Sequence, residues 1–109
     1  MPREAGLPPG TLALLILRLL NTGPLHGYAI AQRIHALSQE ELSVEEGSLY
    51  PALQKLLLNG WVKASWTTSE SGREVREYRL TAMGRKQLEA ALTEYKRTSR
   101  GIALVLDNA

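Results

Sequence analysis

The chain has 109 residues, of which 44% are hydrophobic, and its formal net charge is +2. This length supports one hydrophobic core, and because a short chain buries a smaller share of its surface, we expect a single unit that gains stability by forming a dimer. There is no cysteine, which excludes disulfides, thiolate catalysis and cysteine-bound zinc.

The amino-terminal residues carry no pattern typical of export or membrane insertion. Three prolines and an acidic residue interrupt the first ten positions, so no basic start leads into a continuous apolar segment. The most apolar stretch, residues 12–20, contains Arg18 and is much shorter than the roughly 20 residues needed to cross a bilayer. We therefore expect an uncleaved, cytoplasmic protein with no membrane partner.

Two helices are predicted in the first third of the chain. The first covers residues 9–20, because prolines are tolerated in an initial turn, and it ends before the turn residues 22–24. Its apolar residues occupy more faces than one subunit can cover, so part of this helix is expected to contact a second copy. The second helix covers residues 27–37. Its apolar residues are Tyr28, Ile30, Ala31, Ile34 and Leu37.

A third helix is predicted between residues 43 and 60. Four leucines follow the i, i+4, i+7, i+8 spacing of one buried helix face: Leu49, Leu53, Leu56 and Leu57. The remaining faces carry mainly polar side chains: Ser48, Tyr50, Gln54 and Lys55. This helix therefore has one side for the core and one side for a partner.

The start of the third helix has two alternatives. Ser43 with Glu46 matches a capping box, but this start places Pro51 inside the helix, where it removes a hydrogen bond. Ser48 as the cap places Pro51 in the tolerated first turn. We expect either a bend near Gly47 or the later start.

A β-hairpin is predicted after the third helix. Residues 61–68 alternate apolar with polar side chains, residues 69–72 have turn composition, and residues 74–80 form a second strand. A helix followed by a hairpin is typical of the second half of a winged helix-turn-helix. The predicted fold class is therefore mainly α with a β-hairpin wing, and residues 1–80 are expected to form the DNA-binding domain.

A long helix is predicted from residue 82 to residue 106, with Thr81 as its cap. Apolar residues recur along it at alternating spacings of four and three, which is the pattern of a helix that packs against another helix. We expect residues 81–109 to be a dimerisation helix that forms one compact unit with the winged part. The predicted dimer interface consists of Leu12, Leu15, Ile16, Leu88, Leu92, Tyr95, Ile102 and Leu106.

The chain resembles the PadR family of transcriptional regulators from about residue 7 to residue 106. The resemblance rests on four motifs: His26-Gly27-Tyr28, Glu46-Gly47-Ser48-Leu49-Tyr50-Pro51-Ala52-Leu53, residues 57–60, and Glu77-Tyr78-Arg79-Leu80-Thr81 with Gly84-Arg85. The short chain with one carboxy-terminal helix resembles the smaller subfamily. That resemblance implies a homodimer formed through the first and last helices. It also implies a repressor that releases operator DNA when an aromatic or drug-like molecule binds.

Seven residues are expected to contact double-stranded DNA. The third helix would read base edges in the major groove while the hairpin holds the backbone. The expected contacts are Ser48, Tyr50, Gln54 and Lys55 from the helix, and Lys63, Arg73 and Arg76 from the wing. Five of them have an alternative: Tyr50 could complete the core, Lys55 could be an ordinary solvated lysine, and wing glutamates could pair with the three wing cations.

The distribution of charge is compatible with such a surface. Residues 1–46 contain three Lys or Arg and five Asp or Glu, whereas residues 47–109 contain ten and six. Local clusters of cations suffice for phosphate contacts, but a solvated surface of mixed charge has the same composition.

An effector site is expected around Tyr95, because relatives in the small subfamily commonly carry Trp at what looks like the matching position. Leu12 and Leu15 would line the same space. The alternative is that Tyr95 only completes the seam between two helices. Tyrosine offers less stacking area than tryptophan and adds a hydroxyl group, so the flat ligands of relatives need not carry over.

The sequence gives no support for an enzyme, a metal or a cofactor. The two histidines, His26 and His35, have no acids at ligand spacing nearby, and Ser48 does not lie in the elbow motif of a serine hydrolase. The leading hypothesis is a DNA-binding repressor. The alternative is a ligand-sensing or protein-interaction dimer without a DNA role.

Overall fold

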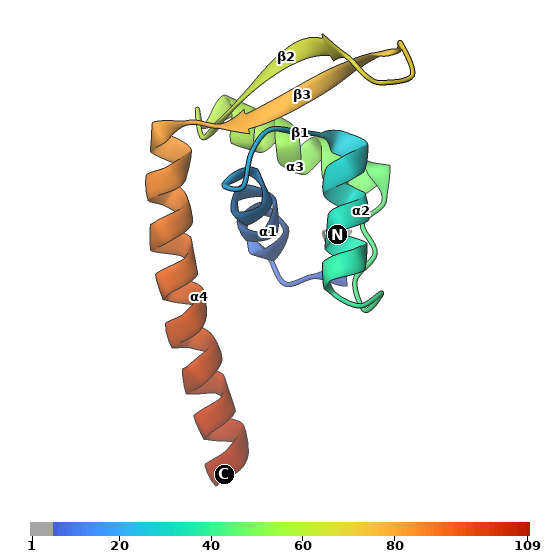
Figure 1. Cartoon of the computed structure of the whole chain (residues 1–109). Coiled ribbons are helices and arrows are strands. Elements are labelled where there is room, and N and C mark those ends of the chain that lie inside the picture. Colours follow the sequence, from blue (N-terminus) through green and yellow to red (C-terminus); the bar gives the residue numbers. More distant parts are fainter. Residues whose placement is uncertain (1–5) are drawn as a thin grey trace.

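The computed structural model describes residues 6–109, which fold as a small three-stranded sheet beside four helices (Figure 1). No helix in this part of the chain is long and apolar enough to cross a membrane. The elements in chain order are α1 (Thr11–Leu20), β1 (Leu25–His26), α2 (Gly27–Leu37), α3 (Glu46–Leu58), β2 (Val62–Thr68), β3 (Glu74–Leu80) and α4 (Ala82–Asn108).

The mainly α fold with a hairpin wing is confirmed, and so are the bounds of α2 and β3. Helix α1 begins two residues later than predicted, because Gly10 takes a left-handed conformation with φ 83° just before it. The prolines therefore precede α1 instead of forming its first turn. Helix α4 extends two residues beyond the predicted end.

Helix α3 begins at Glu46, so the predicted later start at Ser48 is wrong. The predicted cap at Ser43 is wrong as well, because Glu45 is the capping residue and makes no side-chain cap hydrogen bond. The carbonyl of Glu45 accepts from the backbone N–H groups of Ser48 at 3.0 Å and Leu49 at 2.9 Å. Pro51 consequently lies within the helix, where it cannot donate to the carbonyl of Gly47.

The sheet has the strand order β1-β3-β2, with antiparallel pairing throughout. The two-residue strand β1 joins the hairpin by pairing Leu25 with Tyr78 and His26 with Glu77. It was not predicted, since two residues are too few to show an alternating pattern. By this pairing, the segment that leads into α2 is fixed to the base of the wing.

The core is built around α1, whose residues Leu12, Ile16 and Leu17 are almost completely buried. Figure 1 shows α1 between α4 and α2, with α3 above it, beneath the hairpin. The prediction that Leu12 and Ile16 contact a second copy is wrong, because both are 0% exposed within their own subunit. Leu88 is also buried in the core, where it anchors the first half of α4. The other fully buried side chains are Ile30, Leu49, Leu53 and Leu56.

Helix α4 packs on the core through its first half, where Leu88 is buried, and its last turns project beyond the core (Figure 1). The predicted cap is confirmed: the Thr81 hydroxyl accepts from the N–H of Gly84 at 3.0 Å and donates to the carbonyl of Gly60 at 2.7 Å. The carboxy-terminal half exposes a set of large apolar side chains: Tyr95, Ile102, Leu104, Val105 and Leu106.

Candidate nucleic-acid interface

Helix α3 presents two sides of different character. Leu49, Leu53 and Leu56 are each 1% exposed and face the core. The outer side carries exposed Gln54 and Lys55, with Ser48 partly buried near the start of the helix. The structure thus places the predicted polar residues of this helix on one accessible surface.

Tyr50 belongs to this surface and also contacts α2. Its side chain is 44% exposed. A β-carbon added to Gly27 would lie 2.9 Å from the Tyr50 hydroxyl oxygen and 3.1 Å from a ring carbon, so the ring packs on the first turn of α2. Tyr50 therefore packs on α2 through its hydroxyl and ring edge, while the rest of the side chain is accessible.

The three predicted wing cations do not share one face. Cross-strand partners in an antiparallel pair lie on the same side of the sheet, and Trp66 pairs with Arg76 while Lys63 pairs with Arg79. Lys63 and Trp66 are three residues apart, so they point to opposite faces. Arg76 therefore lies on the face that carries Tyr78, and Lys63 lies on the outer face of the sheet.

Arg73 lies at the end of the hairpin turn. Its N–H donates to the Ser69 hydroxyl at 3.3 Å, and its carbonyl accepts from the N–H of Ser69 at 2.8 Å. The turn is thus closed by its own hydrogen bonds, and the exposed Arg73 side chain stands at the tip of the wing.

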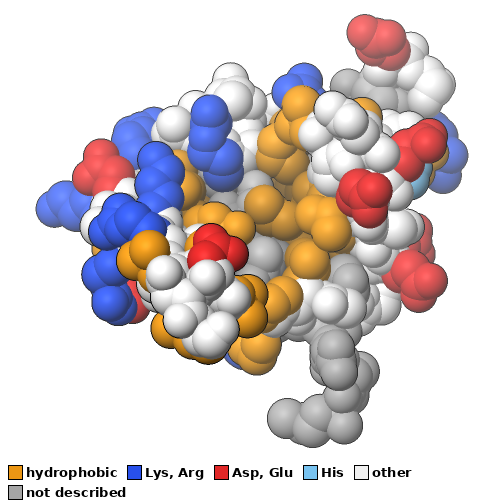
Figure 2. Space-filling view, turned by 90° about the horizontal axis from the view of Figure 1, so that it is seen from below, with side chains coloured by type: hydrophobic (Ala, Val, Ile, Leu, Met, Phe, Trp, Pro, Cys, Tyr) orange, Lys and Arg blue, Asp and Glu red, His pale blue; other side chains and the backbone are white. Residues whose placement is uncertain are grey.

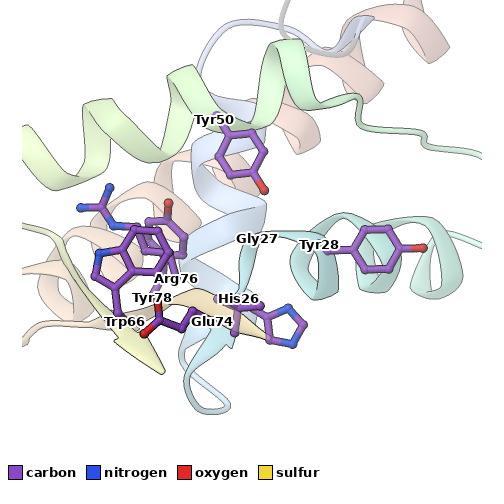
Figure 3. Close-up of a pocket in the computed structure, with 9 residues that line it drawn as sticks. His26, Gly27, Tyr28, Tyr50, Trp66, Glu74, Arg76 and Tyr78 are labelled. Carbon is purple, nitrogen blue, oxygen red and sulfur yellow. The ribbon is translucent and has the colours of Figure 1, made fainter. Parts of the chain in front are cut away.

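A hollow of about 380 Å³ lies between the start of α2, helix α3 and the wing (Figure 3). We name it the aromatic hollow; its lining residues are His26, Gly27, Tyr28, Tyr50, Trp66, Glu74, Val75, Arg76 and Tyr78. Figure 3 shows Tyr50 reaching from α3 toward Gly27, with Trp66, Arg76 and Tyr78 gathered beside it. Five elements of the fold, β1, α2, α3, β2 and β3, thus meet at one concave surface.

Two of these side chains, Arg76 and Tyr78, interact within the hollow. The Arg76 guanidinium stands over the Tyr78 ring, 5.9 Å from its centroid, which is a cation–π arrangement. Burial raises the pKa of the Tyr78 phenol; Arg76 opposes this shift, and the nearby Tyr50 adds to it. Tyr78 therefore lies buried at the bottom of the hollow with its phenol uncharged.

Only Tyr50 and Arg76 among the lining residues of the aromatic hollow were predicted as site residues; the unpredicted ones include Tyr28, Trp66 and Glu74. Tyr28 was assigned to the apolar side of its helix, yet it is 65% exposed; Trp66 is 69% exposed, and Glu74 begins β3. The alternation in β2 could have identified Trp66, because it shares a face with Val62 and Ala64 but extends beyond the core. No local pattern distinguishes Tyr28 from a buried aromatic residue in the first turn of a helix.

The predicted effector residues are not brought together as expected. Tyr95 is 51% exposed and lines a second hollow of about 380 Å³ between the start of α1 and α4, together with Thr11 and Leu14. Leu12 is wholly buried, so it cannot contact a ligand without opening the core.

The partly buried Leu15 faces a third hollow instead. This groove of about 240 Å³ lies between α1 and α2. Its lining residues are Leu15, Arg18, Leu19, Ile34, Leu37, Ser38 and Leu42. Seen from below in Figure 2, apolar side chains gather in the middle of this side of the molecule, beside a group of Lys and Arg side chains.

The described residues contain no group of three or more His, Asp or Glu side chains that could hold a metal ion. The three ion pairs found in this part of the chain, His35–Glu40, Glu77–Arg79 and Glu94–Arg97, lie at exposed or half-exposed positions. None involves Arg73, Arg76 or Lys55, so these cations remain available to an external anion.

A two-helix unit followed by an antiparallel wing, with a polar outer side on the second helix of the unit, defines a winged helix-turn-helix protein. A sequence model of the PadR-like family of transcriptional regulators matches residues 16–90. The chain belongs to this family.

Solved structures agree with this assignment. A transcriptional regulator from Clostridium thermocellum is 30% identical, with a TM-score of 0.79 over 86% of this chain and 88% of the other. A PadR family transcription regulator from Clostridium difficile is 25% identical, with a TM-score of 0.77 over 89% of this chain and 99% of the other. Among protein sequences, an uncharacterized protein from Lysinibacillus sphaericus is 26% identical to this chain over 90% of each chain.

Proposed function

We propose that this transcriptional regulator binds operator DNA by inserting α3 into the major groove and holding the flanking backbone with the wing. The observation that carries the proposal is the place of Tyr50, which lines the aromatic hollow with Arg76 and lies one helical turn before the exposed Gln54 and Lys55 on α3. Gln54 has the donor and acceptor needed to read an adenine edge, and Lys55 can reach guanine or a phosphate.

The aromatic hollow supplies backbone contacts in this proposal. Tyrosine hydroxyls, arginine and the backbone N–H groups at a helix start are common partners of phosphate oxygens. The start of α2 opens on the hollow without a side-chain cap at His26, and Arg76 stands nearby. Tyr28, Tyr50 and Arg76 are therefore the expected phosphate contacts, and Arg73 extends them at the wing tip.

We propose that Lys63 contributes less to DNA binding than the sequence analysis predicted. It lies on the outer face of the sheet opposite Arg79, turned away from Arg76. We assign it at most an indirect electrostatic contribution.

We propose that the active form is a homodimer joined through α4. Its last two turns expose four apolar side chains: Ile102, Leu104, Val105 and Leu106. Neighbouring exposed apolar side chains of this kind mark a surface that contacts another protein chain. The groove that contains Leu15 and Leu37 is a matching apolar surface for a second copy. Dimerisation would set two α3 helices about 34 Å apart for successive half-sites.

A repressor role in the cytoplasm, with release by a small aromatic effector at Tyr95, completes the proposal. The hollow between α1 and α4 supports this effector site, because its lining is mostly apolar and Tyr95 offers a stacking surface. Since the hollow joins the helix proposed for dimerisation to α1, a ligand there would alter the angle between subunits.

The proposal is tested with fluorescent duplexes that cover the region upstream of the protein's own gene. We expect one duplex to bind at least 100-fold tighter than a shuffled duplex, with affinity falling as salt rises. Binding that ignores both sequence and salt would favour the alternative of a ligand-sensing or protein-interaction dimer. Replacing Gln54 with Ala should reduce the preference for one duplex, and Arg33→Ala on α2 is a matched surface control.

A further inference from the structure

The aromatic hollow offers more ring surface than phosphate contacts require. Tyr50 and Trp66 face it from α3 and β2, buried Tyr78 forms its floor, and Tyr28 stands at its rim. An isolated exposed aromatic side chain is unremarkable, but several around one concavity mark a binding site. Its volume of about 380 Å³ lies within the range of small-molecule sites, about 300–1,000 Å³.

The two charged side chains of the hollow indicate which ligands it favours. Arg76 stands over the Tyr78 ring, so this ring already holds a cation from its own chain. Glu74 lies on the same face of β3, two residues away, and none of the ion pairs in residues 6–109 involves it. A free carboxylate beside electron-rich ring faces favours a positively charged ligand.

The shape of the hollow limits the ligand further. In Figure 3 the Trp66 ring and Glu74 lie on one side, and Tyr50 reaches toward Gly27 on the other. Stacking between a Trp and a Tyr ring requires a flat ligand. Because Gly27 has no side chain, the Tyr50 ring packs close to its backbone, and this contact holds the ring at the wall of the hollow.

We propose that the aromatic hollow binds a planar aromatic cation of two or three fused rings, and that this ligand excludes DNA from the same surface. The ligand would stack against Trp66 and Tyr50 while its charge faces Glu74. The exclusion rests on the proposed function, since it requires the hollow to be part of the DNA interface. This site is separate from the hollow at Tyr95, and its ligand would act by direct competition without changing the dimer.

Ligand binding is tested first without DNA, by NMR and calorimetry on the full chain. The probes are N-methylquinolinium as the cation, quinoline as its neutral analogue and 1-naphthoate as an anion. Trp61 and Trp66 give two indole N–H signals, which Trp66→Phe assigns. We expect the cation to shift the Trp66 signal and to bind at least tenfold tighter than 1-naphthoate.

Two glutamate variants test the role of charge. Glu74→Gln should weaken the cation about tenfold and leave quinoline unchanged, while the matched control Glu70→Gln on the same hairpin should change neither. Equal affinity for all three probes, or a shift confined to Trp61, would overturn the proposed site.

Competition is tested by adding N-methylquinolinium to the protein bound to its fluorescent operator. We expect release of DNA from the native chain, and about tenfold more cation needed for release from Glu74→Gln. The two proteins are compared at concentrations that bind the same fraction of the same duplex, because Glu74→Gln also removes a negative charge from the proposed DNA surface. Binding of the cation to DNA itself then affects both measurements equally. Equal release from both proteins would overturn the competition. If the chain binds no DNA at all, the proposed function fails, and the NMR titration still decides the ligand site.

Discussion

The backbone carbonyl of Trp61 occupies the space that a side chain on Gly84 would need. A β-carbon built on Gly84 overlaps that oxygen and lies 2.8 Å from a methyl carbon of Leu80. Because the obstructing atom is backbone, it cannot move aside cheaply. The first turn of α4 therefore packs directly on the chain segment between α3 and β2, an arrangement that only glycine permits.

Replacing Gly84 with Ala should destabilise the fold. Overpacking of this kind typically costs about 1–3 kcal/mol, which corresponds to a fall in Tm of about 4–8 °C per kcal/mol for a chain of this size. The measurement is thermal unfolding followed by circular dichroism at fixed protein concentration.

The matched control for this prediction is Gly101→Ala in the same helix. Nothing lies within 4 Å of the added carbon there, so alanine should stabilise the helix by about 0.5–1 kcal/mol. A Gly84 variant as stable as the native protein would contradict the packing described at this junction.

The contact between Gly27 and Tyr50 can be measured by a double-mutant cycle. Gly27→Ala should lower the free energy of unfolding by about 1 kcal/mol, because the new methyl group meets the Tyr50 hydroxyl at 2.9 Å. Tyr50→Phe removes that oxygen, so the penalty should shrink in the double variant. Urea unfolding of the four proteins gives the coupling, and strictly additive effects would show that the two residues do not interact.

Arg76 should contribute more to DNA affinity than Lys63. Arg76→Gln should weaken binding to all duplexes and reduce the dependence of log K on log salt by about one. Lys63→Gln should have a smaller effect, because its side chain is on the other face of the sheet. Lys86→Gln on α4 removes the same charge away from the interface and serves as the control, with fluorescence anisotropy as the measurement.

Dimerisation should depend on the end of α4. Leu106→Lys places a charge in the proposed interface, and we expect the sedimentation of a monomer at concentrations where the native chain is a dimer. Leu58→Lys is the matched control, since Leu58 is an exposed leucine at the end of α3, outside the proposed interface. An equal response of both variants would argue against α4 as the contact between subunits.

Stability should decline at alkaline pH because of Tyr78. Its pKa is raised in the folded state by burial, so the folded chain holds the phenol proton more tightly than the unfolded chain does. The resulting stabilisation is complete below the unfolded pKa of about 10 and is lost as the pH rises through the folded value. Urea unfolding at several pH values should show a shallower alkaline decline for Tyr78→Phe than for the native protein.

The pattern of apolar residues was sufficient to predict α2 and β3, because both depend on local periodicity. The cap of α4 was predictable because it depends on one hydrogen bond to the Thr81 side chain. The start of α3 was not predictable in this way, since Glu45 forms the first turn through its backbone carbonyl alone. The exposed Tyr28 and the buried Leu12 were misplaced for a related reason. Periodicity groups residues on a helix face, but only the tertiary arrangement decides what covers that face.

The close packing of Gly84 on Trp61 has a mechanical consequence for the whole molecule. A helix of 27 residues is about 40 Å long. The junction at Gly84 fixes the direction in which α4 leaves the core: a difference of about 5° in that direction would place the far end about 3.5 Å away over that length. In two chains joined at the far ends of their α4 helices, the distance between the α3 helices would be set at the junction that holds Gly84, far from the residues that touch DNA.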